Sequence, residues 1–233
     1  MRYFYDPTIS NETIHHTLPQ EESKHIVRVL RMSTGDDLAI LNGKGDLYHC
    51  VISGTEGKLV KVDITKREQY EADKPIHIAI AATKNADRIE WFLEKATELG
   101  LTELTFISCK NSERSRVKID RLIKKAISAM KQSRRAYLPT IHETIDFKSF
   151  IESHPNGLIA HCYDEQKHHF NKVYHTGNCP ILIGPEGDFT LEEVDLALQY
   201  GYKSITLGET RLRTETAALY AVTLAKTINE TEH

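Results

Sequence analysis

The sequence predicts an α/β protein in which a small all-β domain precedes a mostly parallel sheet flanked by helices. Residues 1–70 alternate apolar and polar positions around tight turns, whereas from Pro75 onward short apolar runs alternate with segments of helical periodicity. Two of the later runs stop at glycine and lead into polar loops, within Ile181–Thr190 and Leu207–Ala217. Because ligands bind beyond the carboxyl ends of strands in open α/β sheets, we expect the functional site there.

The first 70 residues form the predicted β domain. A strand at 37–41 meets the turn Asn42–Gly45, and its Asn-Gly pair is a strong hairpin signal. The chain returns over 46–53, turns at 54–57 and continues as a strand over 58–64. This meander predicts a small all-β barrel.

The second predicted domain spans residues 75–233, after a charged linker at 66–75. Gly100 is expected to end a helix, and Thr190 with Glu193 forms a capping box that opens another. The expected strands are 76–82, 104–108, 158–162, 181–183 and 205–207, and the expected helices are 87–99, 120–133, 191–200 and 214–229. This alternation is typical of a mostly parallel sheet.

The composition and the lack of long apolar runs favour a globular protein over a membrane protein. A hydrophobic content of 40% and a charged content of 27% are typical of globular proteins. The longest apolar run, 76–82, is far too short to cross a bilayer, so no membrane association is expected. The N-terminus lacks a signal-peptide core, and the four cysteines are scattered, which favours a cytoplasmic, reducing location.

The turn Gly184–Gly187 has two interpretations. It is either an ordinary connection between strand and helix, or a place where glycines let backbone groups approach a ligand, with Glu186 projecting into the crevice. No lysine follows the glycines and no G-x-G-x-x-G pattern is present, so a phosphate-binding loop is excluded.

The segment Leu212–Ala217 places a cation, a carboxylate and two hydroxyls at the start of a helix. Capping by Thr214, with Glu215 in the first turn, is the simpler interpretation. It does not explain Arg211 and Arg213, because cations are unfavourable at the positive end of a helix dipole. Their position indicates an anion opposite them, such as a carboxylate or an RNA phosphate.

A basic stripe lies between residues 110 and 135, within a chain of net charge −3. Its ten cations are Lys110, Arg114, Arg116, Lys118, Arg121, Lys124, Lys125, Lys131, Arg134 and Arg135. Such a run is either a solvated face or a surface for the phosphate backbone of a nucleic acid. His25, Arg28 and Arg31 in the β domain extend it in the second interpretation.

Histidines and cysteines between residues 161 and 179 suggest zinc, but none has the spacing of a zinc motif, so no metal is expected. No G-x-S-x-G elbow is present, and a hydrolytic triad is not expected either.

Four motifs in order resemble the RsmE family, the 16S ribosomal RNA uridine N3-methyltransferases of the SPOUT superfamily. They are Lys95–Gly100, Gln132–Ser133 with Arg135 and Pro139, Leu182–Gly187, and Leu207–Gly208 with Leu212–Ala217. His25 with Val29–Arg31 resembles the N-terminal PUA-like domain of that family. One departure is Arg134, which stands where the family often has a small residue, so either Arg134 or Arg135 is a candidate for the family's arginine role.

The resemblance implies an RNA-binding PUA-like β-barrel over 1–70 and a SPOUT methyltransferase domain over 75–233 with a C-terminal trefoil knot. It also implies a homodimer, S-adenosylmethionine as cofactor, and 16S rRNA of the small ribosomal subunit as partner. The residues expected to bind the cofactor are His161, Ile183, Gly184, Glu186, Gly187, Leu207, Gly208, Leu212, Arg213, Thr214, Thr216 and Ala217. Those expected to bind RNA are His25, Arg28, Arg31, Arg114, Arg116, Lys124, Lys125, Arg134 and Arg135.

Methylation of uracil N3 requires loss of the N3 proton, because the neutral nitrogen has no useful lone pair. Arg213 is the candidate to stabilise the resulting charge or to anchor a phosphate. Glu215 and Glu186 are both candidates for the base, and the sequence does not rank them. The alternatives are a SPOUT enzyme acting on tRNA or on a ribose 2′-hydroxyl, and a non-catalytic RNA-binding factor in ribosome assembly.

Overall fold

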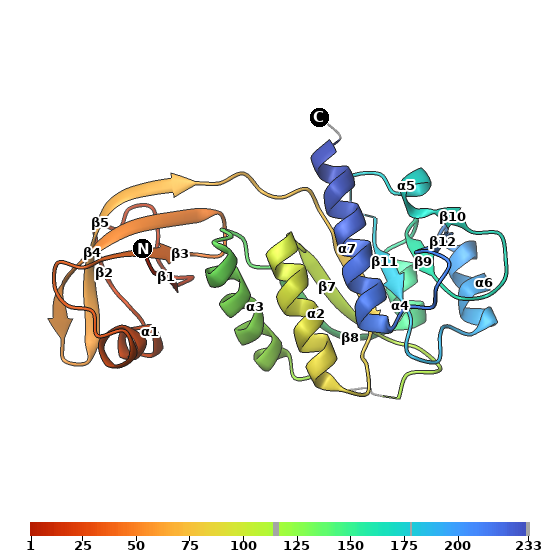
Figure 1. The fold of residues 1–233 in the computed structure, drawn as a ribbon, viewed down its shortest axis with the longest axis horizontal. Coiled ribbons are helices and arrows are strands. Elements are labelled where there is room, and N and C mark those ends of the chain that lie inside the picture. The colour runs from red at the N-terminus through yellow and green to blue at the C-terminus, as the bar shows by residue number, and fades with distance from the viewer. Residues whose placement is uncertain (114–116, 178, 232–233) are drawn as a thin grey trace. The chain divides into compact units, whose positions relative to one another are not determined.

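The computed structural model describes residues 1–113, 117–177 and 179–231 (Figure 1). The chain divides into two compact units. The first comprises Met1–Ala72 and Met130–Leu138, and the second comprises Asp73–Ala129 and Pro139–His233.

The first unit contains a five-stranded sheet in the order β1-β3-β4-β5-β2. Its strands are β1 (Tyr3–Tyr5), β2 (His15–Thr17), β3 (Asp37–Leu41), β4 (Asp46–Glu56) and β5 (Leu59–Gln69). The pair β1–β3 is parallel, and the other pairs are antiparallel. One face buries a cluster that includes Phe4, Leu38, Tyr48 and Val62, as the period-two pattern predicts.

The prediction of an all-β first domain is wrong between residues 20 and 29. Helix α1 (Gln20–Lys24) runs directly into one π-helical turn, η1 (His25–Val29). Ser23 joins this helical segment to the sheet, because its buried hydroxyl donates to the carbonyl of Leu18 and accepts from the N–H of Val60. Such long-range contacts leave no signal in a short stretch of sequence.

The predicted linker is wrong over residues 66–69, which continue β5. They pair with residues 46–49 of β4, and the guanidinium of Arg67 forms an ion pair with Asp46 at 2.7 Å. Backbone pairing therefore stabilises a strand whose charged side chains suggested a loop. The second turn also lies later than predicted, because β4 runs through Glu56 and Gly57 takes the left-handed conformation at φ +61°.

The second unit contains, among the described residues, a seven-stranded sheet in the order β10-β12-β9-β11-β6-β7-β8. The strands are β6 (His77–Ala81), β7 (Glu103–Ser108), β8 (Thr140–Asp146), β9 (Leu158–Ala160), β10 (His168–His169), β11 (Ile181–Ile183) and β12 (Lys203–Thr206). The strand pairs are parallel, which confirms the predicted fold class. The trefoil knot stays a prediction.

After residue 73, the described residues form the helices α2 (Ala86–Leu99), α3 (Ile119–Ser133), α4 (Phe147–Ser153), α5 (Phe170–Val173), α6 (Leu191–Gln199) and α7 (Thr214–Thr231). The last residues of α3, from Met130, belong to the first unit. Gly100 ends α2 in the left-handed conformation at φ +95°, as predicted. The capping box of Thr190 and Glu193 opens α6, also as predicted. Local signals therefore place these helix ends correctly.

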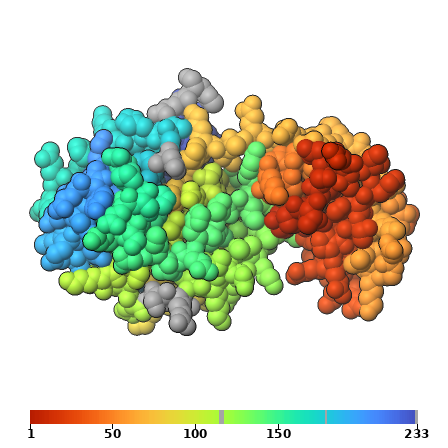
Figure 2. All heavy atoms as spheres, turned by 180° about the vertical axis from the view of Figure 1, so that it is seen from behind, coloured from red at the N-terminus to blue at the C-terminus, as the bar shows by residue number. Residues whose placement is uncertain are grey.

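Helices cover the sheet on two faces. In Figure 1, α2 and α7 lie side by side on the face of the sheet that is turned toward the viewer. The helices α4 and α6 cover the opposite face, which is turned toward the viewer in Figure 2. The core beneath α4 and α6 includes Phe150, Leu182, Phe189 and Val194. The strand β8 and helix α4 are missing from the sequence prediction, because most side chains of β8 are partly or fully exposed and give no apolar run.

Two predicted strands have different bounds. The strand expected at 158–162 ends at Ala160, and the strand expected at 205–207 is β12, which ends at Thr206. His161, Cys162 and Leu207 therefore belong to loops that follow the strands. This displacement matters because those loops line the candidate site.

Candidate active site and its two cavities

Three adjacent parallel strands end at the same edge of the sheet. In the order β12-β9-β11, each strand leads into a loop, at 207–213, 161–167 and 184–190 respectively. The three loops line a cavity of about 580 Å³. The ligand site predicted at the carboxyl ends of the strands therefore coincides with a real cavity.

The lining of this donor-side cavity, as we name it, combines apolar walls with charged groups of both signs. The apolar members include Ile183, Ile205, Leu207, Leu212 and Ala217. The charged members are Lys167, Glu186, Asp188, Glu209, Arg211 and Arg213. Its volume and mixed lining fit a small ligand that carries an apolar body and several polar groups.

The glycines and hydroxyls of the site hold the loops close together. A Cβ at Gly184 would lie 3.1 Å from ring atoms of Phe189, so the loop is packed too tightly for a side chain without a shift. Thr214, at the start of α7, is buried, and its hydroxyl donates to the carbonyl of Gly184 at 3.1 Å. Thr214 is already the first residue of α7, and its hydroxyl ties the helix to the glycine loop.

His161 lines the donor-side cavity and is only 6% exposed. Its Nε2 lies 2.9 Å from the hydroxyl oxygen of Ser204, and its Nδ1 has no hydrogen-bond partner among the described residues. Burial, and secondarily the charge of Lys167, lower the pKa of His161, so the imidazole is neutral at pH 7. A buried nitrogen without a partner beside a cavity is a natural contact for a polar ligand atom.

Asp188 and Lys167 are site residues that the sequence analysis missed. Asp188 takes the left-handed conformation at φ +65°, and its carboxylate accepts from the backbone N–H of Cys162 at 2.8 Å. It thereby joins the loop after β11 to the loop after β9. Lys167 donates to the backbone carbonyls of His161 and Tyr163. The pair Gly187-Asp188 is a turn signal that could have pointed to Asp188. Lys167 lies in a segment without any motif, so no signal in the sequence points to it.

Most of the predicted cofactor residues line the donor-side cavity. They are His161, Ile183, Gly184, Glu186, Leu207, Gly208, Leu212, Arg213, Thr214 and Ala217. Gly187 lies instead beside Asn111, whose amide donates to the carbonyl of Gly187 at 3.3 Å. Thr216 lines a second cavity.

The second cavity, which we name the indole-side cavity, has a volume of about 600 Å³. It is lined by Asp87, Arg88, Trp91, Arg211, Leu212, Arg213, Glu215 and Thr216. The segment from Arg211 to Arg213 belongs to the lining of both cavities. The three predicted catalytic residues are therefore divided between the two cavities. Glu186 lines the donor-side cavity, Glu215 lines the indole-side cavity, and Arg213 lines both.

The two candidate bases have different surroundings. Glu186 is exposed, and its Oε1 accepts from the backbone N–H of Lys84 at 3.2 Å. Glu215 is only 7% exposed, and its Oε1 lies 3.7 Å from Nε of Arg88. Its Oε2 has no hydrogen-bond partner in the part of the chain that the structure describes.

The predicted RNA-binding residues fall in both units. His25, Arg28, Arg31, Arg134 and Arg135 belong to the first unit, and Lys124 and Lys125 belong to the second. Lys124 is exposed, whereas Lys125 forms an ion pair with Glu94 at 3.2 Å. Arg114 and Arg116 lie outside the described residues. Arg134 has a φ of +59°, a left-handed conformation that favours glycine.

Among the described residues, no helix is long and apolar enough to cross a membrane. Within the same ranges, no group of three or more His, Cys, Asp or Glu side chains is arranged to hold a metal ion.

A parallel α/β sheet with a cavity at its carboxyl edge, joined to a small β domain, defines a two-domain α/β protein with a small-ligand site. Residues 70–226 match the model of the RNA methyltransferase domain, and residues 18–65 match the RNA methyltransferase PUA domain. The chain belongs to the RNA methyltransferase family.

Individual relatives agree with this assignment. A crystal structure of a probable rRNA-methyltransferase from Porphyromonas gingivalis is 38% identical, covers 100% of both chains and has a TM-score of 0.89. The ribosomal RNA small subunit methyltransferase E of Rickettsia conorii is 29% identical over 88% of this chain and 86% of its own length. The same enzyme from Neisseria gonorrhoeae, crystallised with S-adenosyl methionine, is 26% identical over 98% of both chains, with a TM-score of 0.84. The resemblance to the RsmE family is confirmed.

Proposed function

We propose that the protein transfers the methyl group of S-adenosylmethionine to N3 of a uridine in 16S ribosomal RNA of the small subunit. The observation that carries this proposal is the donor-side cavity, which three strand-end loops build at the carboxyl edge of the sheet in a member of the RNA methyltransferase family. The similarity to small-subunit rRNA methyltransferases supports the choice of substrate.

The residues of the donor-side cavity fit S-adenosylmethionine. Ile183, Leu207 and Leu212 would enclose the adenine, and the unpartnered Nδ1 of His161 offers a contact for a polar atom of the nucleoside. The charged residues of both signs match the carboxylate, the ammonium and the sulfonium of this ligand. When bound, the cofactor supplies an electrophilic methyl group.

The protein's own residues have two tasks, which are to position the uracil and to remove its N3 proton. A carboxylate within hydrogen-bond reach accepts this proton. The guanidinium of Arg213, which borders both cavities, stabilises the negative charge that develops on the uracil carbonyl oxygens. We also propose a cytoplasmic homodimer, for which the resemblance to the family is the support.

Binding of S-adenosylmethionine should raise the melting temperature by about 5–10 °C at a ligand concentration about 100 times Kd, since ligand binding to the native state alone contributes about 2.7 kcal/mol there. Differential scanning fluorimetry measures this shift, with adenosine triphosphate as the control ligand. An unchanged melting temperature would contradict the proposal and favour the non-catalytic RNA-binding factor.

Nucleoside mass spectrometry of RNA from a deletion strain identifies the product. Loss of N3-methyluridine from 16S rRNA, restored by the wild-type gene, is the expected result. Loss of a methylated tRNA nucleoside or of a ribose 2′-O-methyl group would instead support one of the alternative acceptors.

Lys124 provides a test of the basic stripe, because it is exposed, whereas replacing Lys125 would also break its ion pair with Glu94. The substitution Lys124→Gln should weaken RNA binding and reduce the slope of log K against log salt by about 0.7–0.9, the contribution of one phosphate contact. Filter binding over a range of salt concentrations measures the slope. Lys172→Gln, at an exposed lysine of α5, is the control, and equal slopes for the two variants would remove Lys124 from the RNA surface.

A further inference from the structure

Asp188, which lines the donor-side cavity, has a backbone conformation that is unfavourable for residues with a side chain. Its φ of +65° lies in the left-handed region, which glycine enters without a steric penalty. Aspartate tolerates this region better than most residues, and what it adds over glycine at this position is a carboxylate. A strained residue beside a cavity indicates that its side chain has a function there.

Both oxygens of the Asp188 carboxylate accept hydrogen bonds from the backbone. Oδ2 accepts from the N–H of Cys162, in the loop after β9, at 2.8 Å, and Oδ1 accepts from the N–H of Phe189 at 2.8 Å. The carbonyl of Asp188 is fixed as well, because it accepts from the side-chain amide of Asn111 at 3.1 Å. The carboxylate is thereby held in one orientation, and its hydrogen bond to Cys162 is charge-assisted.

The loop after β9, residues 161–167, is held by Asp188 and by Lys167. The ammonium of Lys167 donates to the carbonyls of His161 and Tyr163, at 3.2 and 2.7 Å. Asp188 accepts from the N–H of Cys162, which lies between these two residues in the chain. A carboxylate on the N–H and an ammonium on the two carbonyls therefore fix the backbone from residue 161 to residue 163.

His161 is the residue whose side chain this arrangement positions. Its Nε2 lies 2.9 Å from the hydroxyl oxygen of Ser204 on β12, and its Nδ1 has no hydrogen-bond partner among the described residues. Since Ser204 anchors one end of the ring, the direction of Nδ1 depends on where the backbone of His161 is held. A group that is fixed before its ligand arrives avoids the cost of becoming ordered on binding.

We propose that Asp188 is a positioning residue for the cofactor, because its carboxylate clamps the loop after β9 and so presents Nδ1 of His161 to S-adenosylmethionine. This inference rests on the proposed function and adds a determinant of cofactor affinity to it. Without the clamp the loop samples other conformations, and the apparent affinity falls with the fraction of molecules in the competent one.

A direct contact between Asp188 and the cofactor is the alternative. The carboxylate lines the same cavity, and the cofactor carries positive charge on its sulfonium and its ammonium. Both carboxylate oxygens are already engaged by backbone N–H groups, those of Cys162 and Phe189. The geometry therefore favours a role of Asp188 through the loop.

The pair Asp188→Gly and Asp188→Ala separates the clamp from the backbone strain. Both variants lack the carboxylate, so both should bind S-adenosylmethionine about 10–100-fold more weakly in calorimetry, the range for loss of a hydrogen bond to a charged group. Glycine relieves the strain and alanine keeps it, so the alanine variant should melt at the lower temperature. Wild-type affinity in Asp188→Gly would overturn the proposal, as would affinities that follow the melting temperatures instead of the missing carboxylate.

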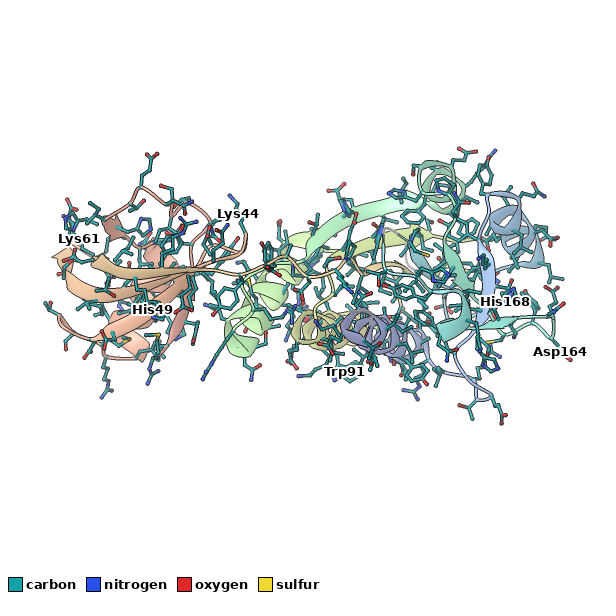
Figure 3. All side chains as sticks on the ribbon, turned by 90° about the horizontal axis from the view of Figure 1, so that it is seen from above. Lys44, His49, Lys61, Trp91, Asp164 and His168 are labelled. Carbon is teal, nitrogen blue, oxygen red and sulfur yellow. The ribbon has the colours of Figure 1, made fainter. Side chains whose placement is uncertain are left out.

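The variant Asp188→Asn tests the acceptor, because asparagine tolerates the left-handed region and keeps one oxygen for the N–H of Cys162. Its affinity should lie between those of the wild type and Asp188→Gly. Asp164→Asn is the matched control, since Asp164 is an exposed carboxylate of the same loop outside the cavity lining (Figure 3). It should bind the cofactor like the wild type. A loss equal to that of Asp188→Gly would assign the effect to charge alone and overturn the clamp.

Three ligands distinguish positioning from direct contact. S-adenosylmethionine, S-adenosylhomocysteine and 5′-methylthioadenosine share the nucleoside, but the second lacks the sulfonium charge and the third lacks the amino acid. Because His161 contacts the nucleoside in the proposed function, Asp188→Gly should weaken binding of all three by the same factor. A loss confined to S-adenosylmethionine, or absent for 5′-methylthioadenosine, would show that Asp188 touches the cofactor itself and would overturn the proposal.

Kinetics on unmethylated small ribosomal subunits provide the second readout. Glycine preserves the backbone at residue 188, and Arg213 is unchanged, so Asp188→Gly should raise KM for S-adenosylmethionine and keep kcat within about twofold of the wild type. A large loss of kcat at saturating cofactor would contradict a role in positioning the cofactor alone.

Failure of the inference differs from failure of the proposed function. If the wild-type protein binds no S-adenosylmethionine in calorimetry, the proposed function fails. If the wild type binds the cofactor and methylates RNA, and Asp188→Gly matches it in affinity and in KM, only the present inference fails.

Discussion

Replacing Arg213 with alanine is expected to lower kcat for methyl transfer by about 10²–10³-fold, with little change in the affinity for S-adenosylmethionine. The expected loss is that of one preorganised donor aimed at developing negative charge. Arg213 is exposed and borders both cavities, immediately before the buried Thr214 that ties α7 to the glycine loop. Truncation of an exposed side chain leaves that anchor in place, so the fold and the donor-side cavity should persist.

Single-turnover methylation and calorimetry measure the two quantities separately. Arg213→Lys is the informative companion, because lysine keeps the charge and loses the planar fork of donors. An intermediate rate for lysine would indicate that charge and geometry both contribute. Lys172→Ala, at an exposed lysine of α5, is the control. A wild-type rate for Arg213→Ala would exclude a catalytic role, and lost cofactor affinity with normal kcat would show that Arg213 binds the cofactor instead.

Lowering the pH from 7 to 5 is expected to reduce the free energy of unfolding by about 2 kcal/mol through His77 alone. His77 lies at the start of β6 and is 2% exposed, with Nε2 2.8 Å from the hydroxyl oxygen of Thr105. Burial lowers the pKa of His77 to about 4, although Glu103, whose Oε2 lies 3.7 Å from Nδ1, opposes the shift. His154, in ring contact, and His142, which pairs with Glu103, add to the lowering.

The sign follows from proton uptake. In the unfolded chain His77 has its ordinary pKa near 6.5, so between pH 6.5 and pH 4 the unfolded state binds the additional proton. Stability therefore falls as the pH falls through this window, and it is fully retained above the unfolded value. Urea denaturation at pH 7 and pH 5 measures the loss.

The variant His77→Gln separates this residue from its neighbours, because glutamine can still donate to Thr105 and does not titrate. Its unfolding free energy should depend on pH less than that of the wild type by about 2 kcal/mol over the same interval. His168→Gln, at an exposed histidine of β10, is the control. Equal pH dependence in wild type and His77→Gln would show that His77 is not the titrating group.

The sequence alone determined the features that depend on residues close together in the chain. Gly100 ended α2, the box of Thr190 and Glu193 opened α6, and apolar runs marked the strands β6, β7 and β11. These signals are local, since caps and strand periodicity involve neighbours within a few positions. The loop at Gly184 and the segment before Thr214 were recognisable as parts of a site for the same reason.

Only the tertiary structure decided which side chains meet across long separations. It extended β5 over residues 66–69 by pairing with β4, and it joined the loops after β9 and β11 through Asp188 and Cys162. It also separated the two candidate bases, because Glu215 became buried beside Arg88 while Glu186 stayed exposed. Burial and an unmet hydrogen bond are properties of the packed chain, and no short pattern of residues encodes them.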